Sequence, residues 1–370
     1  MLRKSRLLFA VAILSLMALI GTGCTKATET KQEPKSEAKG ETAAPAQSGG
    51  TAPAAAKSVT IRYAHFQPGT MDQPKQAAAL AFKSYVEANT GGSVKVEIFP
   101  ASQLGDANVV LEGLKLGSIQ MGVVHDGPIS AVYKPLGVFN LPFLFNGQGE
   151  AWTVFDSAYT KEMGEDMRKQ TGIRLLALAD NGIRHFTNSK KEIRSPEDMK
   201  GMKIRIQPSP LYEMLVKGTG ASPSAIGWAE LPAALQQGVV DGQENGVTNI
   251  LAASLFQTQK FITLDGHVYS YHAYLMNDKF FAGLTPEQQK AVQEGVELAK
   301  WIHRGMTANQ DMNAESILSA KGMKVTKLTP AEIEAFRQAT LPPVADWMKK
   351  EYGEKWVSDL LKTVEAVRGK

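Results

Sequence analysis

The residues best placed to do chemistry in this sequence surround Arg205, which lies in the stretch GMKIRIQPSP at 201–210. Apolar and polar residues alternate there as in a β-strand, and Pro208 and Pro210 cannot continue a ladder of strand hydrogen bonds. We therefore expect Arg205 near the C-terminal end of a short strand, at the edge of a cleft. A guanidinium in that position can hold a carboxylate through two parallel hydrogen bonds. From spacing alone, a structural arginine paired with a nearby acid remains the simpler interpretation.

The sequence lacks the motifs of the common hydrolases and nucleotide-binding enzymes. It has no G-x-S-x-G, no H-E-x-x-H, no Walker loop and no two histidines at i and i+4. The histidines of HVYSYH, His267 and His272, are five residues apart, which suits neither a helix face nor one face of a strand. We therefore expect no catalytic residues, no metal site and no cofactor. A secreted α/β enzyme acting on a small carboxylate is the alternative hypothesis.

The first 23 residues are typical of a secretory signal peptide. Basic residues precede an apolar run at 7–20, and these 14 residues are fewer than the roughly 20 that a membrane-spanning helix needs. The run ends in LIGTGC, which resembles the lipobox of bacterial lipoproteins, although Gly21 stands where that motif prefers leucine. We expect cleavage before Cys24, lipidation of Cys24 and an extracytoplasmic location, on the cell membrane or in the periplasm. Plain secretion, with Cys24 lost in the leader, is the alternative.

Composition limits the partners of the mature chain. Cys24 is the only cysteine, so a disulfide framework, a thiol nucleophile and a cysteine metal site are excluded. The 41 basic and 37 acidic residues give a net charge of +4, and removal of the three basic residues of the leader leaves 4 − 3 = +1. A nucleic-acid partner is not indicated. Residues 24–57 contain no large apolar residue and predict a disordered tether, about 30 Å long on average.

The folded part predicts two similar β-α-β-α-β units. In the first unit strands are expected at 59–66, 94–100 and 118–127, and in the second at 202–209, 221–227 and 239–246, with amphipathic helices between them. A helix in each unit stops at a glycine, Gly117 or Gly238, which can supply a left-handed cap. Open parallel sheets bind ligands beyond the C-terminal ends of their strands. Two such lobes predict a binding cleft between them.

A long helix is expected to cross both lobes. A capping box at 285–288 starts it, and helical spacing continues to residue 320, which corresponds to about 50 Å at 1.5 Å per residue. If this helix bends, Gly295 or Gly305 is the expected position. The fold class is therefore α/β, with lobe I formed by 58–181 and 271–310 and lobe II by 182–270 and 311–370.

Several motifs, in order along residues 59 to 340, resemble the DctP-type solute-binding proteins of TRAP (tripartite ATP-independent periplasmic) transporters. They are FPASQLGD, LEGLKLGSIQM, VFNLPFLF, NGIRHFTNSKKEIRSPEDMKGMKIRIQPSP and ALQQGVVDGQEN. The resemblance implies a two-lobed periplasmic-binding-protein fold, type II-like, without catalysis. It also implies capture of a small organic acid, of the C4-dicarboxylate or sugar-acid class, for delivery to the membrane subunits of a TRAP transporter.

The resemblance assigns ligand-binding roles to three residues. Arg205 is implied as the clamp on the substrate carboxylate. Arg184, in NGIRHFTN, and Asn245, in DGQEN, are implied as further ligand contacts. The alternatives are an ion pair at the hinge for Arg184 and a turn-capping amide for Asn245.

Five more residues are candidates for the cleft. They are His125 and Asp126 after a strand of the first unit, Trp228 at the start of a helix in the second, and His65 with Phe66 at the end of the first strand. Asp126 in the pocket would repel a second carboxylate and favour a hydroxylated monocarboxylate, whereas a protonated His125 would do the reverse. Gly246 after DGQEN and the segment IGW depart from the family pattern, so the identity of the acid stays open.

Overall fold

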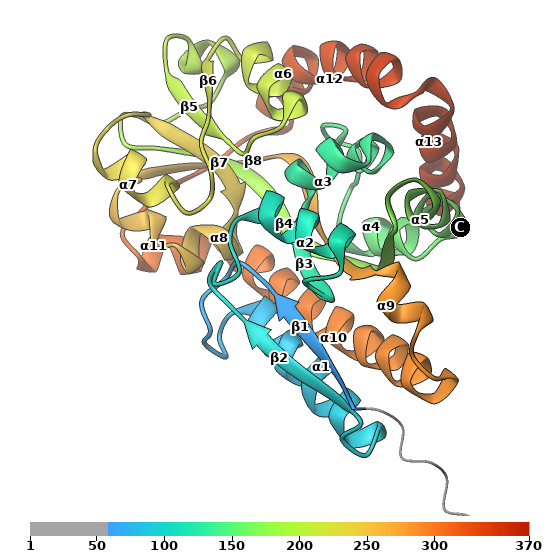
Figure 1. The fold of residues 1–370 in the computed structure, drawn as a ribbon. Helices are drawn as coiled ribbons and strands as arrows, with labels where there is room; N and C mark the ends of the chain where they lie inside the picture. The colour runs from blue at the N-terminus through green and yellow to red at the C-terminus, as the bar shows by residue number, and fades with distance from the viewer. Residues whose placement is uncertain (1–57, 370) are drawn as a thin grey trace, which may run out of the picture. The chain divides into compact units, whose positions relative to one another are not determined.

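The computed structural model describes residues 58–369, and both predicted β-α-β-α-β units are present in it (Figure 1). The first unit consists of β1 (Val59–Ala64), α1 (Pro74–Asn89), β2 (Val94–Phe99), α2 (Ala107–Leu116) and β3 (Met121–His125). The second consists of β5 (Lys203–Ile206), α6 (Pro210–Gly218), β6 (Ser222–Ala225), α7 (Leu231–Gln236) and β7 (Gly242–Gly246). In each unit the first strand lies between the other two and runs parallel to both. Gly117 and Gly238 both have positive φ angles, 78° and 70°.

Two long antiparallel strands that the sequence analysis did not predict join the units. They are β4 (Ile173–Asn188) and β8 (Phe261–Asn277), which pair with each other along most of their length. β3 pairs with β8 and β7 with β4, both antiparallel, so each half of the sheet is mixed rather than purely parallel. Within residues 58–369 the strand order is β2-β1-β3-β8-β4-β7-β5-β6, and β9 (Lys324–Lys327) adds to β8. A β-bulge interrupts β4 at Gly182, where φ is 97°.

The predicted long helix is shorter than expected. α10 (Pro286–Met312) begins with the predicted capping box of Thr285 and Gln288, but it ends before Asn313, and a separate helix follows, α11 (Ala314–Ala320). The helix is interrupted at Asn313, whereas Gly295 and Gly305, where a bend is expected, both lie inside α10. A Cβ on Gly295 would come within 2.9 Å of Val86, so this glycine allows α10 to pack closely on α1.

The remaining helices cover the sheet. They are α3 (Asp126–Val132), η1 (Lys134–Asn140), α4 (Gln148–Phe155), α5 (Ala158–Thr171), η2 (Pro196–Met199), α8 (Val247–Ala252), η3 (Leu255–Gln257), α9 (Asp278–Ala282), α12 (Pro330–Tyr352) and α13 (Glu354–Arg368). Buried apolar side chains form one cluster beneath α1 and α10, one around α7 and α11, and a larger one beneath α12 and α13. The boundaries of the two lobes stay a prediction.

The predicted signal peptide, Cys24 and the tether lie outside the described residues. Among residues 58–369, none of the helices combines the length and the hydrophobicity that a membrane crossing requires.

Candidate functional site

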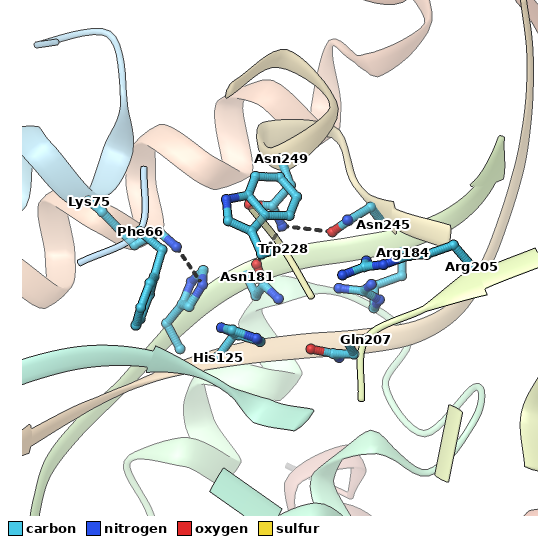
Figure 2. Close-up of a pocket in the computed structure, with 11 residues that line it drawn as sticks. Phe66, Lys75, His125, Asn181, Arg184, Arg205, Gln207, Trp228, Asn245 and Asn249 are labelled. Atoms are coloured by element: carbon cyan, nitrogen blue, oxygen red, sulfur yellow. Dashed lines mark hydrogen bonds between the residues drawn. The ribbon is translucent and has the colours of Figure 1, made fainter. Parts of the chain in front are cut away.

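A pocket lies where strands of both units end, beside the paired strands β4 and β8 (Figure 2). About 340 Å³ of space, part of it open to solvent, lies between its lining residues. Its lining side chains come from β3, β4, β5, β7 and β8, from the first turns of α1 and α8, and from the segments that follow β1, β5 and β6. These residues are Phe66, Lys75, His125, Asn181, Arg184, Arg205, Gln207, Trp228, Asn245, Asn249 and His272.

Six of the eight residues predicted to bind ligand line this pocket. They are Arg205, Arg184, Asn245, Trp228, His125 and Phe66. Each of them lies at or just beyond the end of an element, apart from Arg184, which lies within β4. The structure therefore brings these six together around one cavity, while their contact with a ligand stays a prediction.

Arg205 is a buried cation without an acidic partner. Its side chain is only 2% exposed, and its Nε donates a hydrogen bond to the carbonyl oxygen of Ile226 at 2.9 Å. No carboxylate of residues 58–369 lies within 4 Å of its guanidinium. Burial lowers the pKa of Arg205 to about 9, opposed by the attraction of Glu244 and assisted by the repulsion of Arg184. The guanidinium is thus still charged at neutral pH, and an anion in the pocket would stabilise it.

Arg184, in contrast, already has a carboxylate partner. Its Nε and Nη2 donate to the two carboxylate oxygens of Glu244, at 2.5 and 2.8 Å. His267 Nε2 lies 3.3 Å from Glu244, and His267 Nδ1 lies 2.7 Å from Asp265. Although burial opposes it, these two carboxylates raise the pKa of His267 to about 9. Two buried cations and two buried carboxylates therefore compensate one another beside the pocket.

Amide side chains form the wall around Asn245. Asn249 Nδ2 donates to Asn181 Oδ1 at 2.6 Å and to Asn245 Oδ1 at 2.8 Å. Asn181, Asn249 and Gln207 also line the pocket and were not predicted from the sequence. Gln207 was recognisable, because it lies two residues after Arg205 on the same face of the strand. Asn181 and Asn249 carried no such pattern.

Asp126, which is predicted to face the ligand, does not line the pocket. Asp126 is fully buried outside the pocket lining, and protein donors surround its carboxylate. These donors are Asn140 Nδ2 at 2.5 Å, Tyr212 OH at 2.8 Å, Ser270 Oγ at 2.8 Å, Gln207 Nε2 at 2.9 Å and the backbone N–H of Gly127 at 3.0 Å. The expected repulsion of a second carboxylate assumed that Asp126 lies in the pocket, and Asp126 does not line it.

His65 is also outside the pocket lining, contrary to the prediction. Its ring is fully buried, and its Nε2 lies 2.8 Å from Gln76 Oε1, in the first turn of α1. Burial lowers the pKa of His65 to about 4, so the ring is neutral at neutral pH. Its neighbour Phe66 does reach the pocket, where it packs edge to face against His125 with ring centroids 5.7 Å apart.

Two basic residues that the sequence analysis missed, Lys75 and His272, complete the lining. Lys75 is 3% exposed, and its Nζ lies 2.8 Å from His272 Nε2. Burial, together with the positive charges of Lys75, Arg205 and Arg184, holds the pKa of His125 well below its usual value. Among residues 58–369, no aspartate or glutamate lines the pocket. The site is therefore suited to an anion.

A metal ion is not indicated by the same residues. Among residues 58–369, no group of three or more histidine, cysteine, aspartate or glutamate side chains is arranged to hold one.

Several known proteins are similar to this chain in both sequence and fold. The family described as "DctP: Bacterial extracellular solute-binding protein, family 7" matches residues 64–351. A solute-binding protein of Verminephrobacter eiseniae is 33% identical over 287 residues, which are 77% of this chain and 84% of the relative. The C4-dicarboxylate-binding periplasmic protein DctP of Rhodobacter capsulatus is 30% identical over 311 residues, 83% of this chain and 91% of that protein.

Among solved structures, the sugar acid binding protein DctPAm from Advenella mimigardefordensis, in complex with galactonate, superimposes with a TM-score of 0.80. It is 27% identical, and the match covers 84% of this chain and 99% of that chain.

Proposed function

Because the chain belongs to the DctP family of bacterial extracellular solute-binding proteins, we propose that it captures a small organic acid outside the cytoplasm and delivers it to the membrane subunits of a TRAP transporter. The names of the relatives support this class of ligand, since one binds C4-dicarboxylates and another was crystallised with galactonate. The proposed ligand is accordingly a C4-dicarboxylate or a sugar acid. The predicted lipid on Cys24 would keep the protein at the membrane surface.

The observation that carries the proposal is the state of Arg205. The one described hydrogen bond of the buried Arg205 guanidinium is from Nε to a backbone carbonyl oxygen. Its two terminal nitrogens are therefore available for a partner. A ligand carboxylate can accept two parallel hydrogen bonds from such a group and compensate its charge at the same time. Arg184 cannot replace it as the main clamp, because Glu244 already occupies its guanidinium.

The pocket also supports a closing movement of the two lobes. His125 belongs to the first unit, whereas Arg205, Trp228 and Asn245 belong to the second or to the segments within it. A small acid that contacts both sets is fully enclosed only when the lobes are closed, so binding would favour the closed state.

The test is ligand binding by Arg205 variants. Native mass spectrometry of the purified mature protein first identifies an acid that copurifies with it, and calorimetry then measures the affinity for that acid. Arg205→Ala should fold but bind more than 30-fold more weakly, because half of a desolvated charge pair is removed, at a cost of about 2 to 5 kcal/mol. Arg205→Lys should also bind weakly, since an ammonium cannot reproduce the two parallel hydrogen bonds.

Arg194→Ala is the matched control, because Arg194 lies between β4 and η2, ahead of β5, and pairs with Glu192 and Glu332 outside the pocket. It should bind like the wild type. Wild-type affinity of Arg205→Ala would refute the proposed clamp.

A further inference from the structure

The pocket has a second basic group that the proposed clamp does not use. Figure 2 shows Lys75 and Arg205 on opposite sides of the pocket, with His125 and Trp228 between them. Lys75 is buried, with only 3% of its surface exposed. No carboxylate of residues 58–369 lies within 4 Å of its Nζ. Like Arg205, it is therefore a buried base without a compensating acid.

One described hydrogen bond of the Lys75 side chain, to His272, defines how its amine is oriented. His272 Nδ1 lies 3.2 Å from the backbone carbonyl oxygen of Asp180, which can only accept, so Nδ1 carries the ring hydrogen. His272 Nε2 then has a lone pair and accepts from Lys75 Nζ at 2.8 Å. One hydrogen of the lysine is held in this way, and the nitrogen keeps further bonding capacity on the side that lines the pocket.

The position of Lys75 contributes nothing evident to the stability of the fold. It is the second residue of α1, and a cation in the first turn of a helix is opposed by the positive end of the helix dipole. Burial of a lysine without a carboxylate is also unfavourable. Burial accordingly lowers the pKa of Lys75 to about 7.

The histidines around Lys75 are themselves bases. They are His65, which follows β1, His125 in β3, His272 in β8 and His303 in α10. None of them can serve as a counterion. Since no carboxylate of residues 58–369 lies within 4 Å of Nζ, an acidic group of the ligand can supply the negative charge that compensates a protonated Lys75.

We propose that Lys75, oriented by His272, receives a second acidic group of the ligand at the end of the pocket remote from Arg205, and that Lys75 becomes protonated as this group binds. The proposal rests on the proposed function, because it assumes that Arg205 holds the first carboxylate. Lys75 is then the residue that selects diacids over monoacids of the same length. The proton comes from solvent and remains on Nζ while the ligand is bound.

The first test compares each diacid with its monoamide, in which a neutral group replaces one carboxylate at constant length. The probes are malonate, succinate, glutarate and adipate with their monoamides, and glucarate with gluconate for hydroxylated acids. Wild type should bind at least one diacid 10-fold or more tightly than its neutral counterpart. Lys75→Met should lose this preference, so that its affinities for that diacid and for the neutral counterpart differ less than threefold.

Lys83→Met is the matched control, because Lys83 lies on the same helix but outside the pocket, and it should keep the preference. Lys75→Gln serves as a second variant if Lys75→Met does not fold, as judged by circular dichroism. Equal affinity of wild type for diacids and their neutral counterparts would overturn the role of Lys75 and leave the proposed function intact. If the wild type binds none of these acids, whether their second end is charged or neutral, the proposed function itself is overturned.

The second test counts protons. Calorimetry of the preferred diacid at pH 8, in two buffers with different ionisation enthalpies, should show uptake of nearly one proton by wild type and almost none by Lys75→Met. Uptake that is unchanged in Lys75→Met would assign the proton to another group and overturn this part of the proposal.

Discussion

The substitution Tyr212→Phe removes one hydroxyl group. It should weaken ligand binding although Tyr212 does not line the pocket. Tyr212 OH donates to Asp126 Oδ2 at 2.8 Å, and this bond joins α6 of the second unit to α3, which follows the last strand of the first unit. If α6 moves away from α3 when the cleft opens, the bond breaks. Burial, and next the nearby Asp126, hold the pKa of Tyr212 well above its usual value, so its hydroxyl keeps the donated hydrogen over the whole accessible pH range.

The size of the effect follows from the type of bond. A hydrogen bond to a charged group contributes about 1.5 to 3 kcal/mol. If binding requires the closed state, loss of this amount from the closed state alone weakens affinity by roughly 10- to 150-fold. The aromatic ring remains in place, so the contact of Tyr212 with the guanidinium of Arg184, 5.0 Å from the ring centroid, is preserved.

The control variant, Asn140→Ala, removes a different hydrogen bond to Asp126 Oδ2. The donor of this bond lies in the first half of the chain, like Asp126 itself. Asn140 Nδ2 donates to Asp126 Oδ2 at 2.5 Å, and both residues precede β4. Asn140→Ala should lower the free energy of unfolding but leave affinity nearly unchanged. Calorimetry measures the affinities, and spin labels at Lys83 in α1 and Lys217 in α6 measure the distance across the cleft without ligand. Equal weakening by both variants, or a distance in Tyr212→Phe identical to that in wild type, would refute the reasoning.

Two further predictions concern other parts of the chain. In nuclear magnetic resonance titrations, His267 should stay protonated at neutral pH and titrate near pH 9. Its pKa in the folded protein is raised from 6.5 to about 9, which corresponds to a contribution of about 3 kcal/mol to the free energy of unfolding. This contribution is complete below pH 6.5 and is lost as pH rises to 9. Titration below pH 7 would contradict the charge network of Glu244 and Asp265. Metabolic labelling with a palmitate analogue should tag the wild type but not Cys24→Ser, which should appear in the soluble envelope fraction or the medium; equal labelling of both would leave plain secretion.

Local sequence patterns predicted the elements whose determinants lie close together in the chain. The capping box at Thr285 depends on residues three positions apart, and it forms. The strands of the two β-α-β-α-β units alternate or are short apolar runs between helices, and they were recognised for that reason. The long strands β4 and β8 were missed, because most of their residues are buried on both faces and the alternation of polar and apolar residues disappears.

The candidate site shows the same division. Family motifs and strand ends indicated Arg205, Arg184 and Asn245, and all three line the pocket. Asp126 looked equally suitable in the sequence, yet its side chain turns away from the pocket toward five protein donors. Lys75 had no recognisable pattern, since a lysine in a first helical turn is ordinarily a solvent-exposed residue.

The sequence by itself determined which charged residues the chain contains and near which strand or helix ends they lie. Only the tertiary structure decided which of them are compensated, because the partners meet through strand pairing and helix packing over long separations. Arg184 finds Glu244 60 residues away through the pairing of β4 with β7, and Lys75 finds only the imidazole of His272, 197 residues away. Desolvation makes a buried charge without a partner unfavourable. The electrostatic character of the pocket therefore depends on these distant pairings, which leave Arg205 and Lys75 without an acidic partner among the described residues.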